Sequence, residues 1–269
     1  MAIIIYLTGS GNWTAPSDFA PLNNSFQLWG AGGSGAMGTR SANAGGGGAG
    51  AFAEAINVSV QPGTVLAYSV GAGGARVTTG NGSAGGDTTI SWMKAQGGQG
   101  GVAGLNGAGA GGKAANSVGT YAHTGGDGYW DPYLAAEGFG GGGGGAAGPF
   151  GDGGFGYMSH SSPYGGQGDA AHGGASGIGG NTQSNTAGSP GTEIDASHGS
   201  GGGGGGGYVY GPGFNGGDGG QYGAGGGAGF GGQYGVGGGA GYYSGKGGDG
   251  LIRIQYSPRV VSLTMEFFG

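Results

Sequence analysis

The chain has no cysteine, little charge and no long apolar run. The absence of Cys from its 269 residues excludes disulfides and thiolate metal sites. Charged residues make up only 7%, whereas an ordinary domain has about 25%. The net charge of −6 excludes the basic footprint of a nucleic-acid-binding protein. No stretch of about 18 apolar residues occurs, so we expect no membrane insertion.

The N-terminal segment has no basic region ahead of its apolar residues. Met1–Leu7 is short and β-branched and ends before Thr8-Gly9-Ser10. This pattern is typical of a strand and not of a signal peptide. We therefore expect the protein to be made in the cytoplasm of its host cell without an export signal.

Glycine is what the chain has in abundance, with 86 residues against 9 prolines. Runs such as 141–145 and 201–207 break any Gly-X-Y period, which excludes collagen. Glycine has no side chain to bury and loses much entropy on ordering. If the chain is ordered, hydrogen bonds between closely spaced backbones must hold much of it together.

Short β-strand patterns predict an all-β fold with almost no α-helix. We expect a small β-sandwich part over 1–96, a glycine-rich insertion with display loops over 97–249, a closing strand at 250–256 and an apolar tail at 257–269. The turn Gln61-Pro62-Gly63 separates two of the predicted strands. The predicted strands are 3–7, 25–29, 51–60, 64–70, 87–92 and 250–256.

The glycine runs predict extended helices of the polyproline II type, with three residues per turn and a rise of about 3.1 Å per residue. Unlike proline, each glycine keeps its N–H group, so bare helices can approach until amides and carbonyls pair laterally. We expect a polyglycine-II-like bundle whose loops carry the chemistry.

Several motifs together resemble the glycine-rich domain of bacteriophage and prophage tail-fibre proteins. They are Gly9–Pro16, with Trp13 at its centre, Leu28–Gly33, Val60–Thr64, Ser69–Gly74, Gly85–Ile90 and the strand 250–256. The middle of the chain is loosely similar to the tip adhesins of T-even-type long tail fibres. In those proteins a polyglycine-II sandwich displays loops that bind outer-membrane proteins or lipopolysaccharide. A separate fibre-attachment domain precedes that sandwich, whereas this chain has only its predicted β-sandwich strands at the corresponding place.

Motifs for enzyme, metal and phosphate chemistry are weak, and we expect no enzyme, no cofactor and no metal. Gly107–Lys113 fits G-x-x-x-x-G-K, but Ala114 stands where a Ser or Thr must reach Mg²⁺. Gly-Gly-Asp-Gly occurs three times, and we expect Asp127, Asp218 and Asp249 to accept backbone N–H bonds where glycine helices end. The four histidines lack metal-ligand spacing.

Aromatic residues gather in islands between the glycine runs and are the candidate receptor-binding residues. Tyr and Trp supply rigid contact area at low entropic cost, although the same residues could instead cover the flanks of the bundle. Trp13, Trp29 and Phe52 are expected in the sandwich core, and Trp130 and Tyr133 are the preferred ligand contacts. The candidates are Tyr121, His123, Tyr129, Trp130 and Tyr133, then Tyr157, His160 and Tyr164, then Tyr208, Tyr210 and Phe214.

The tail 257–269 is too apolar for a solvated end, so we expect it to dock on its own sandwich or on a partner. The predicted docking residues are Val260, Val261, Leu263, Met265, Phe267 and Phe268.

Together these features favour a virion protein on a phage tail fibre or similar appendage, present in many copies. Its expected partners are other virion proteins and a host surface receptor, either an outer-membrane protein or a polysaccharide. The alternative is a purely structural capsid-decoration or appendage subunit. Ice binding and a bacterial surface protein are lesser alternatives.

Overall fold

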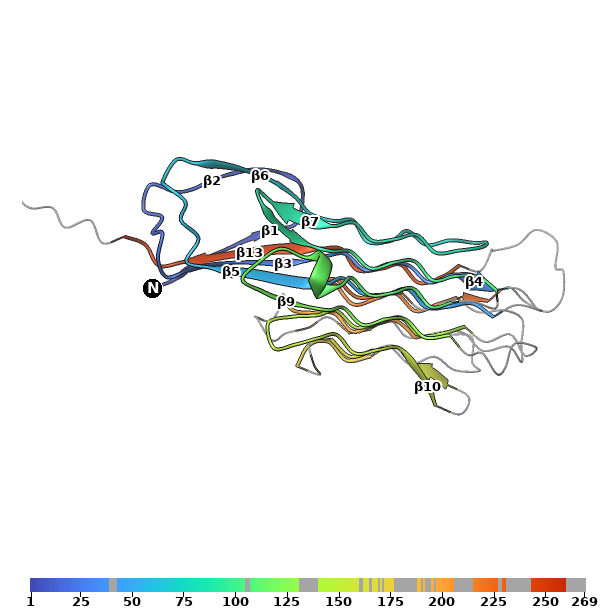
Figure 1. Ribbon diagram of the computed structural model, residues 1–269. Helices are drawn as coiled ribbons and strands as arrows, with labels where there is room; N and C mark the ends of the chain where they lie inside the picture. The colour runs from blue at the N-terminus through green and yellow to red at the C-terminus, as the bar shows by residue number, and fades with distance from the viewer. Residues whose placement is uncertain are drawn as a thin grey trace, which may run out of the picture.

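A computed structural model shows most strands gathered at one end and glycine-rich segments running side by side toward the other (Figure 1). The structure describes the chain except for 39–42, 105–106, 131–139, 160–161, 165, 169, 171, 177–187, 190, 192–194, 196, 206–214, 227–228, 231–242 and 260–269.

The larger sheet is antiparallel, with the order β1-β13-β3-β5-β9. Strand β13 lies between β1 and β3, with Ile254 opposite both Ile5 and Phe26. The predicted closing strand is therefore confirmed. The strands are β1 (Ile3–Leu7), β3 (Asn24–Trp29), β5 (Phe52–Ile56), β9 (Tyr121–His123) and β13 (Leu251–Tyr256).

The second sheet has the order β2-β6-β7-β8 and packs on the first. Between the sheets lies an apolar core that includes Trp13, Phe26, Ile90 and Ile254. The Trp13 and Phe26 rings meet edge to face at 5.7 Å, a favoured aromatic geometry. The all-β sandwich is thus confirmed. The strands are β2 (Gly11–Thr14), β6 (Val65–Ser69), β7 (Thr88–Ile90) and β8 (Met93–Ala95).

Left-handed residues end two strands earlier than the sequence predicts. Strand β5 stops before Asn57, whose φ is 52°, and β7 stops before Ser91, whose φ is also 52°. The short strands β2, β8 and β9 were not predicted, because three or four residues carry too little alternation to detect. The remaining elements are β4 (Met37–Gly38), β10 (Tyr157–Ser159), β11 (Ser162–Tyr164), β12 (Gly229–Phe230) and one 3-10 turn, Ala114–Asn116.

Glycine segments extend directly from the sandwich strands and form what we call the glycine bundle (Figure 1). Segment 30–36 continues β3, 44–51 leads into β5, and 243–250 leads into β13. Bundle segments thus lie on both sides of position 97. The other main segments are 71–77, 80–86, 96–102, 107–113, 124–130, 140–148, 151–156, 201–205, 215–220 and 223–226.

Hydrogen bonds in the bundle repeat every third residue. Gly30, Gly33 and Ala36 donate to segment 44–51, with N···O distances of 2.9, 2.8 and 3.0 Å. The residues next to them, at 31 and 34, donate to segment 80–86, and those at 32 and 35 donate to segment 243–250. A three-residue period directed at three neighbours is the polyglycine-II arrangement that the sequence predicts.

Segment 44–51 lies at the centre of this arrangement. It donates to segments 96–102, 124–130 and 223–226, and it accepts from 30–36, 107–113 and 140–148. A Cβ at Gly50 would lie 1.9 Å from the carbonyl oxygen of Gly30, so this approach requires glycine. The backbone groups are therefore satisfied laterally, without a sheet and without side chains.

A second apolar cluster joins the bundle to the outer face of the large sheet. Trp29, Phe52 and Leu251 meet Ala147 and Tyr222, which come from the glycine-rich region. The Trp29 indole is buried and its Nε1 donates to Ser200 Oγ at 2.9 Å. Trp13 lies in the inter-sheet core as predicted, whereas Trp29 and Phe52, which we also expected there, are buried in this second cluster on the outer face of the sheet. In the described residues, no helix has the length and apolar character that a membrane span needs.

Candidate functional site

The first aromatic island begins at the sandwich. Tyr121 lies in β9 and is 55% exposed. The His123 ring stacks on Phe52 with a centroid distance of 6.2 Å, and its Nδ1 lies 3.7 Å from an Asp152 oxygen. The His123 ring is therefore engaged in packing on Phe52, and its Nδ1 faces the Asp152 carboxylate.

The same island continues at the other end of the bundle. Trp130 is seven positions beyond His123, which corresponds to about 22 Å at about 3.1 Å per residue. Tyr129 and Trp130 are half-buried, and Trp130 Nε1 donates to the Gly104 carbonyl at 3.2 Å. The fold thus distributes the first island over two separate surfaces.

The second island forms a hairpin at the end of the bundle away from the sandwich (Figure 1). Tyr157 in β10 pairs directly with Tyr164 in β11. Tyr157 is 49% exposed, and Phe155 just before it is 67% exposed. Of the predicted receptor-binding residues that the structure describes, Tyr157 in this hairpin and Tyr121 at the sandwich are each about half exposed.

Several predicted residues lie outside the described residues. Among the receptor-binding candidates these are Tyr133, His160, Tyr208, Tyr210 and Phe214, and among the docking candidates they are Val260, Val261, Leu263, Met265, Phe267 and Phe268.

The aspartates of the three Gly-Gly-Asp-Gly motifs accept backbone N–H bonds, as predicted. Asp127 accepts from Gly111 at 2.7 Å, Asp218 from Lys246 at 2.8 Å and Asp249 from Gly73 at 2.8 Å. The prediction that they mark helix ends is wrong for Asp127. Its neighbours Gly126 and Gly128 both make lateral bundle bonds, so the carboxylate covers an amide along the flank of the bundle.

These aspartates also pair with basic side chains and not with one another. Asp127 lies 2.8 Å from Lys113 Nζ, Asp249 lies 3.1 Å from Lys246 Nζ, and Asp218 contacts the guanidinium of Arg76. Among the residues that the structure describes, no three His, Asp or Glu side chains converge in a way that could hold a metal ion.

The phosphate-loop-like stretch 107–113 has its amides engaged in the bundle. Gly109 N–H donates to Gly46 at 2.8 Å and Gly112 N–H to Ala49 at 2.7 Å. Since Gly111 donates to Asp127, a run of free N–H groups that could cradle a phosphate is not presented.

A cluster of titratable side chains lies on the outer face of the large sheet and was not predicted. The His198 ring lies parallel to Tyr6, with centroids 3.6 Å apart, and faces Tyr222 on its other side at 5.8 Å. Asp195 accepts from the Tyr6 hydroxyl at 2.5 Å and lies 2.8 Å from His198 Nδ1. We call Tyr6, Asp195, His198 and Tyr222 the aromatic clamp.

Hydrogen bonding shifts the titration of the clamp. The pKa of Asp195 is held well below its usual range, mainly because the Tyr6 hydroxyl donates to the carboxylate and secondarily because the Ser197 amide does. Burial raises the pKa of Tyr6, and its bond to Asp195 adds to the effect. Both shifts favour the neutral phenol beside an ionised carboxylate.

The clamp contains an Asp–His pair, and the hydroxyl of the nearby Ser200 is engaged elsewhere. Ser200 is buried, accepts from Trp29 Nε1 and donates its proton to the Ala147 carbonyl at 3.0 Å. Its hydroxyl is therefore committed to the packing of the bundle. The clamp thus holds Asp195 and His198 against the sheet through Tyr6.

A polar row runs across the same face of the sheet. Arg253 Nη1 donates to Gln27 Oε1 at 2.8 Å, and Gln27 Nε2 donates to Glu54 Oε1 at 2.9 Å. These residues lie directly opposite one another in β13, β3 and β5. Outward-facing polar positions in the predicted strands 25–29 and 250–256 were the available signal for this row.

An exposed tryptophan at the sandwich was also missed as a functional candidate. Trp92, expected at the end of a strand, lies in the turn between β7 and β8 and is 54% exposed. The pairing of Ile90 with Met93 leaves Ser91 and Trp92 as a two-residue turn. A large apolar residue in a turn between two strand patterns was the sequence feature that could have indicated this exposed tryptophan.

Comparison of the sequence with known proteins assigns the chain to a family. None of the curated proteins matches it significantly. A family model described as "Glycine-rich domain" matches residues 7–223, a range that holds most of both sheets and much of the bundle. By this match the chain belongs to the glycine-rich domain family.

Proposed function

We propose that the protein is a virion protein on a bacteriophage tail fibre or similar appendage, and that it presents loops to a host surface receptor. The observation that carries this proposal is the glycine bundle itself. Its backbone amides bond laterally in three directions, so the segments form a thin, stiff support for the residues at its far end.

The molecule has two functionally distinct ends. Met1 and residues 257–259, which follow β13, lie at the sandwich end, whereas the β10–β11 hairpin lies at the opposite end (Figure 1). A link to other virion proteins at the sandwich and receptor contact at the far end would not compete for space. The apolar tail beyond Arg259 is the proposed docking segment for such a link.

Receptor contact through a few aromatic and polar side chains would be weak for one copy. Many copies on one particle raise the effective concentration and can increase overall binding by about 10²–10⁴. The receptor class in this proposal is an outer-membrane protein or a surface polysaccharide.

A purely structural subunit is the second candidate, and specific contacts favour it. Trp130 is half-buried with its indole N–H bonded to Gly104, and His123 is stacked on Phe52. Aromatic residues used in this way stabilise the bundle and have less of their surface available to a ligand.

Binding of the multimerised full chain to intact host cells tests the choice, with Tyr157→Ala and Tyr121→Ala compared side by side. Both tyrosines are about half exposed, but Tyr157 lies at the far end and Tyr121 at the sandwich. Loss of binding in Tyr157→Ala alone supports loop display. If neither variant nor the unaltered chain binds host cells, the structural subunit is favoured.

A further inference from the structure

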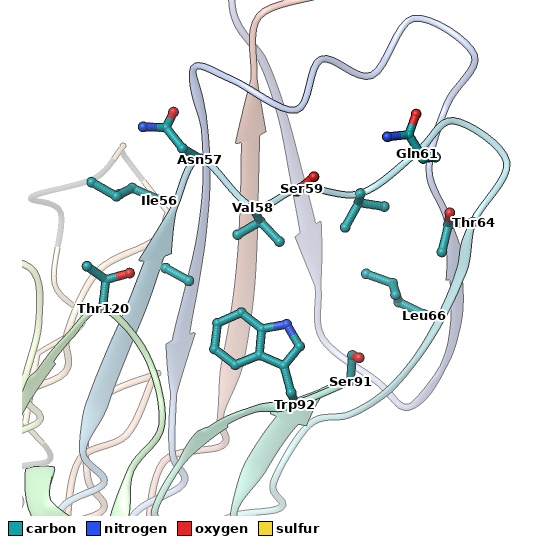
Figure 2. Close-up of a pocket in the computed structure, with 12 residues that line it drawn as sticks. Ile56, Asn57, Val58, Ser59, Gln61, Thr64, Leu66, Ser91, Trp92 and Thr120 are labelled. Atoms are coloured by element: carbon teal, nitrogen blue, oxygen red, sulfur yellow. The ribbon is translucent and has the colours of Figure 1, made fainter.

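A groove opens in the sandwich between the end of β5, the loop that follows it and the β7–β8 turn. Its volume is about 550 Å³, which lies in the range of about 300–1,000 Å³ found for small-molecule sites. Figure 2 shows the Trp92 indole reaching into it toward Val58, with Leu66 on one side and Ile56 on the other. The groove thus has an aromatic and aliphatic floor.

Unusual backbone conformations hold the groove open. Ser91, just before Trp92, and Asn57, at the rim, both have φ of 52°. Asn23, with φ of 58°, donates its N–H to Asn57 Oδ1 at 2.8 Å and fixes that rim. Left-handed conformations at non-glycine residues cost energy and tend to occur at binding sites. Here they project Trp92, the most exposed tryptophan that the structure describes.

The rim is polar but carries no charge. Amide and hydroxyl side chains line it, and none of the lining residues is Asp, Glu, Lys, Arg or His. Within the described part of the chain, the side chains of Ser59, Gln61, Thr64, Ser91 and Thr120 make no hydrogen bond to the protein. They are therefore available to a ligand, and an ionic ligand would meet no opposite charge.

An added peptide strand is disfavoured because most backbone donors along the groove are already used. Asn57 N–H donates to Asn24 O, Val60 N–H to Val58 O and Ser91 N–H to Ala67 O, all at 2.8–2.9 Å. Thr64 and Thr120 N–H donate to Gln61 and Glu54. Strand addition needs a row of free backbone groups, and this groove offers side chains instead.

We propose that this groove binds a neutral saccharide. A pyranose ring has an apolar C–H face that stacks on the indole of Trp92, and its hydroxyls both donate to and accept from amides and hydroxyls such as Asn57 and Thr120. A free indole, aliphatic neighbours and an uncharged amide-hydroxyl rim match this ligand class. The site lies at the sandwich, so it goes beyond the loop-display function and does not depend on it.

The test is binding of neutral trisaccharides to the purified full chain. Maltotriose, cellotriose, mannotriose and chitotriose are the probes, and saturation-transfer NMR and tryptophan fluorescence are the readouts. An uncharged Ser/Thr octapeptide is the competing probe. We expect at least one trisaccharide to bind and Trp92→Ala to weaken it about tenfold or more, equivalent to about 1.4 kcal/mol. Trp92→Tyr should retain most of the affinity.

Two further variants complete the test. Phe155→Ala removes an even more exposed aromatic away from the groove and should leave saccharide binding unchanged. Ser59→Arg places a long charged side chain at the exposed rim without removing core atoms, and it should abolish binding even if Trp92→Ala is unstable. The proposal is overturned if no trisaccharide binds, if only the peptide binds, or if neither Trp92→Ala nor Ser59→Arg weakens binding.

Discussion

The sandwich and the glycine bundle are built on opposite packing rules. In the sandwich, large side chains such as Phe26 and Ile254 fill the space between two sheets. In the bundle, segments approach so closely that a Cβ at Gly32 would lie 1.9 Å from the Ala224 carbonyl oxygen. The first region is stabilised by buried apolar area and the second by satisfied backbone groups. The sandwich should therefore be sensitive to loss of side-chain volume, and the bundle to gain of side-chain volume.

Removing side-chain volume should affect the sandwich most. Phe26 is buried in the inter-sheet core and packs edge to face with Trp13. We expect Phe26→Ala to lower the free energy of unfolding by about 3–5 kcal/mol, measured by denaturant titration. Phe155→Ala, at a 67% exposed site, should change it by less than about 0.5 kcal/mol. Similar losses at both sites would remove the distinction between core and surface.

Adding side-chain volume should affect the bundle most. Gly50→Ala places a methyl group 1.9 Å from the Gly30 carbonyl oxygen. The clash forces segments apart, and we expect a loss of about 3 kcal/mol in thermal or denaturant unfolding. Gly9→Ala is the matched control, because a Cβ there meets nothing within 4 Å. A Gly50→Ala protein as stable as Gly9→Ala would contradict the close packing.

Carboxylates along the flank of the bundle should contribute less to the free energy of unfolding than the core packing of the sandwich or the close packing of the glycine segments. Asp127→Ala leaves the Gly111 N–H without its acceptor, and we expect a cost of about 1 kcal/mol. Asp127→Asn keeps an oxygen acceptor and should recover most of it, although the ion pair with Lys113 is lost. If Asp127→Asn is as damaging as Asp127→Ala, the ion pair and not the amide bond is the main contribution.

The aromatic clamp should give the smallest effect, and one that depends on pH. Asp195 has a lowered pKa in the folded state, so its contribution is present above its unfolded pKa of about 3.9 and is lost as the pH falls through the folded pKa. Its side chain is 39% exposed, so solvent screening limits the contribution to about 1 kcal/mol or less. We expect unfolding curves of the unaltered chain and Asp195→Asn to differ at pH 7 and to converge below about pH 4.

The contribution of the aromatic clamp to stability at alkaline pH depends on Tyr6. Its pKa is raised, so its contribution is present below its unfolded pKa of about 10 and is lost as the pH rises through the folded value. Tyr6→Phe should therefore show its largest deficit below about pH 10. A pH-independent difference in both variants would show that the clamp acts by stacking alone.

Alternation in side chains made much of the sandwich predictable. The pattern of 250–256 indicated a strand, and the structure places it between β1 and β3 in the large sheet. Short strands such as β8 and β9 lacked such a pattern and depend on neighbours in space. The groove at Trp92 was missed for the same reason, because its lining residues come from separate parts of the chain.

The sequence by itself determined the chemistry of the two regions: apolar alternation for strands, and glycine with retained N–H groups for laterally bonded helices. It also determined that carboxylates in Gly-Gly-Asp-Gly would accept amide bonds. Only the tertiary structure decided which segment bonds to which, that segments 30–36 and 44–51 join the bundle, and that Tyr121 and Trp130 lie at different ends. The physical reason is that glycine runs carry no side-chain pattern to specify a partner, so the strands that continue into them set their register.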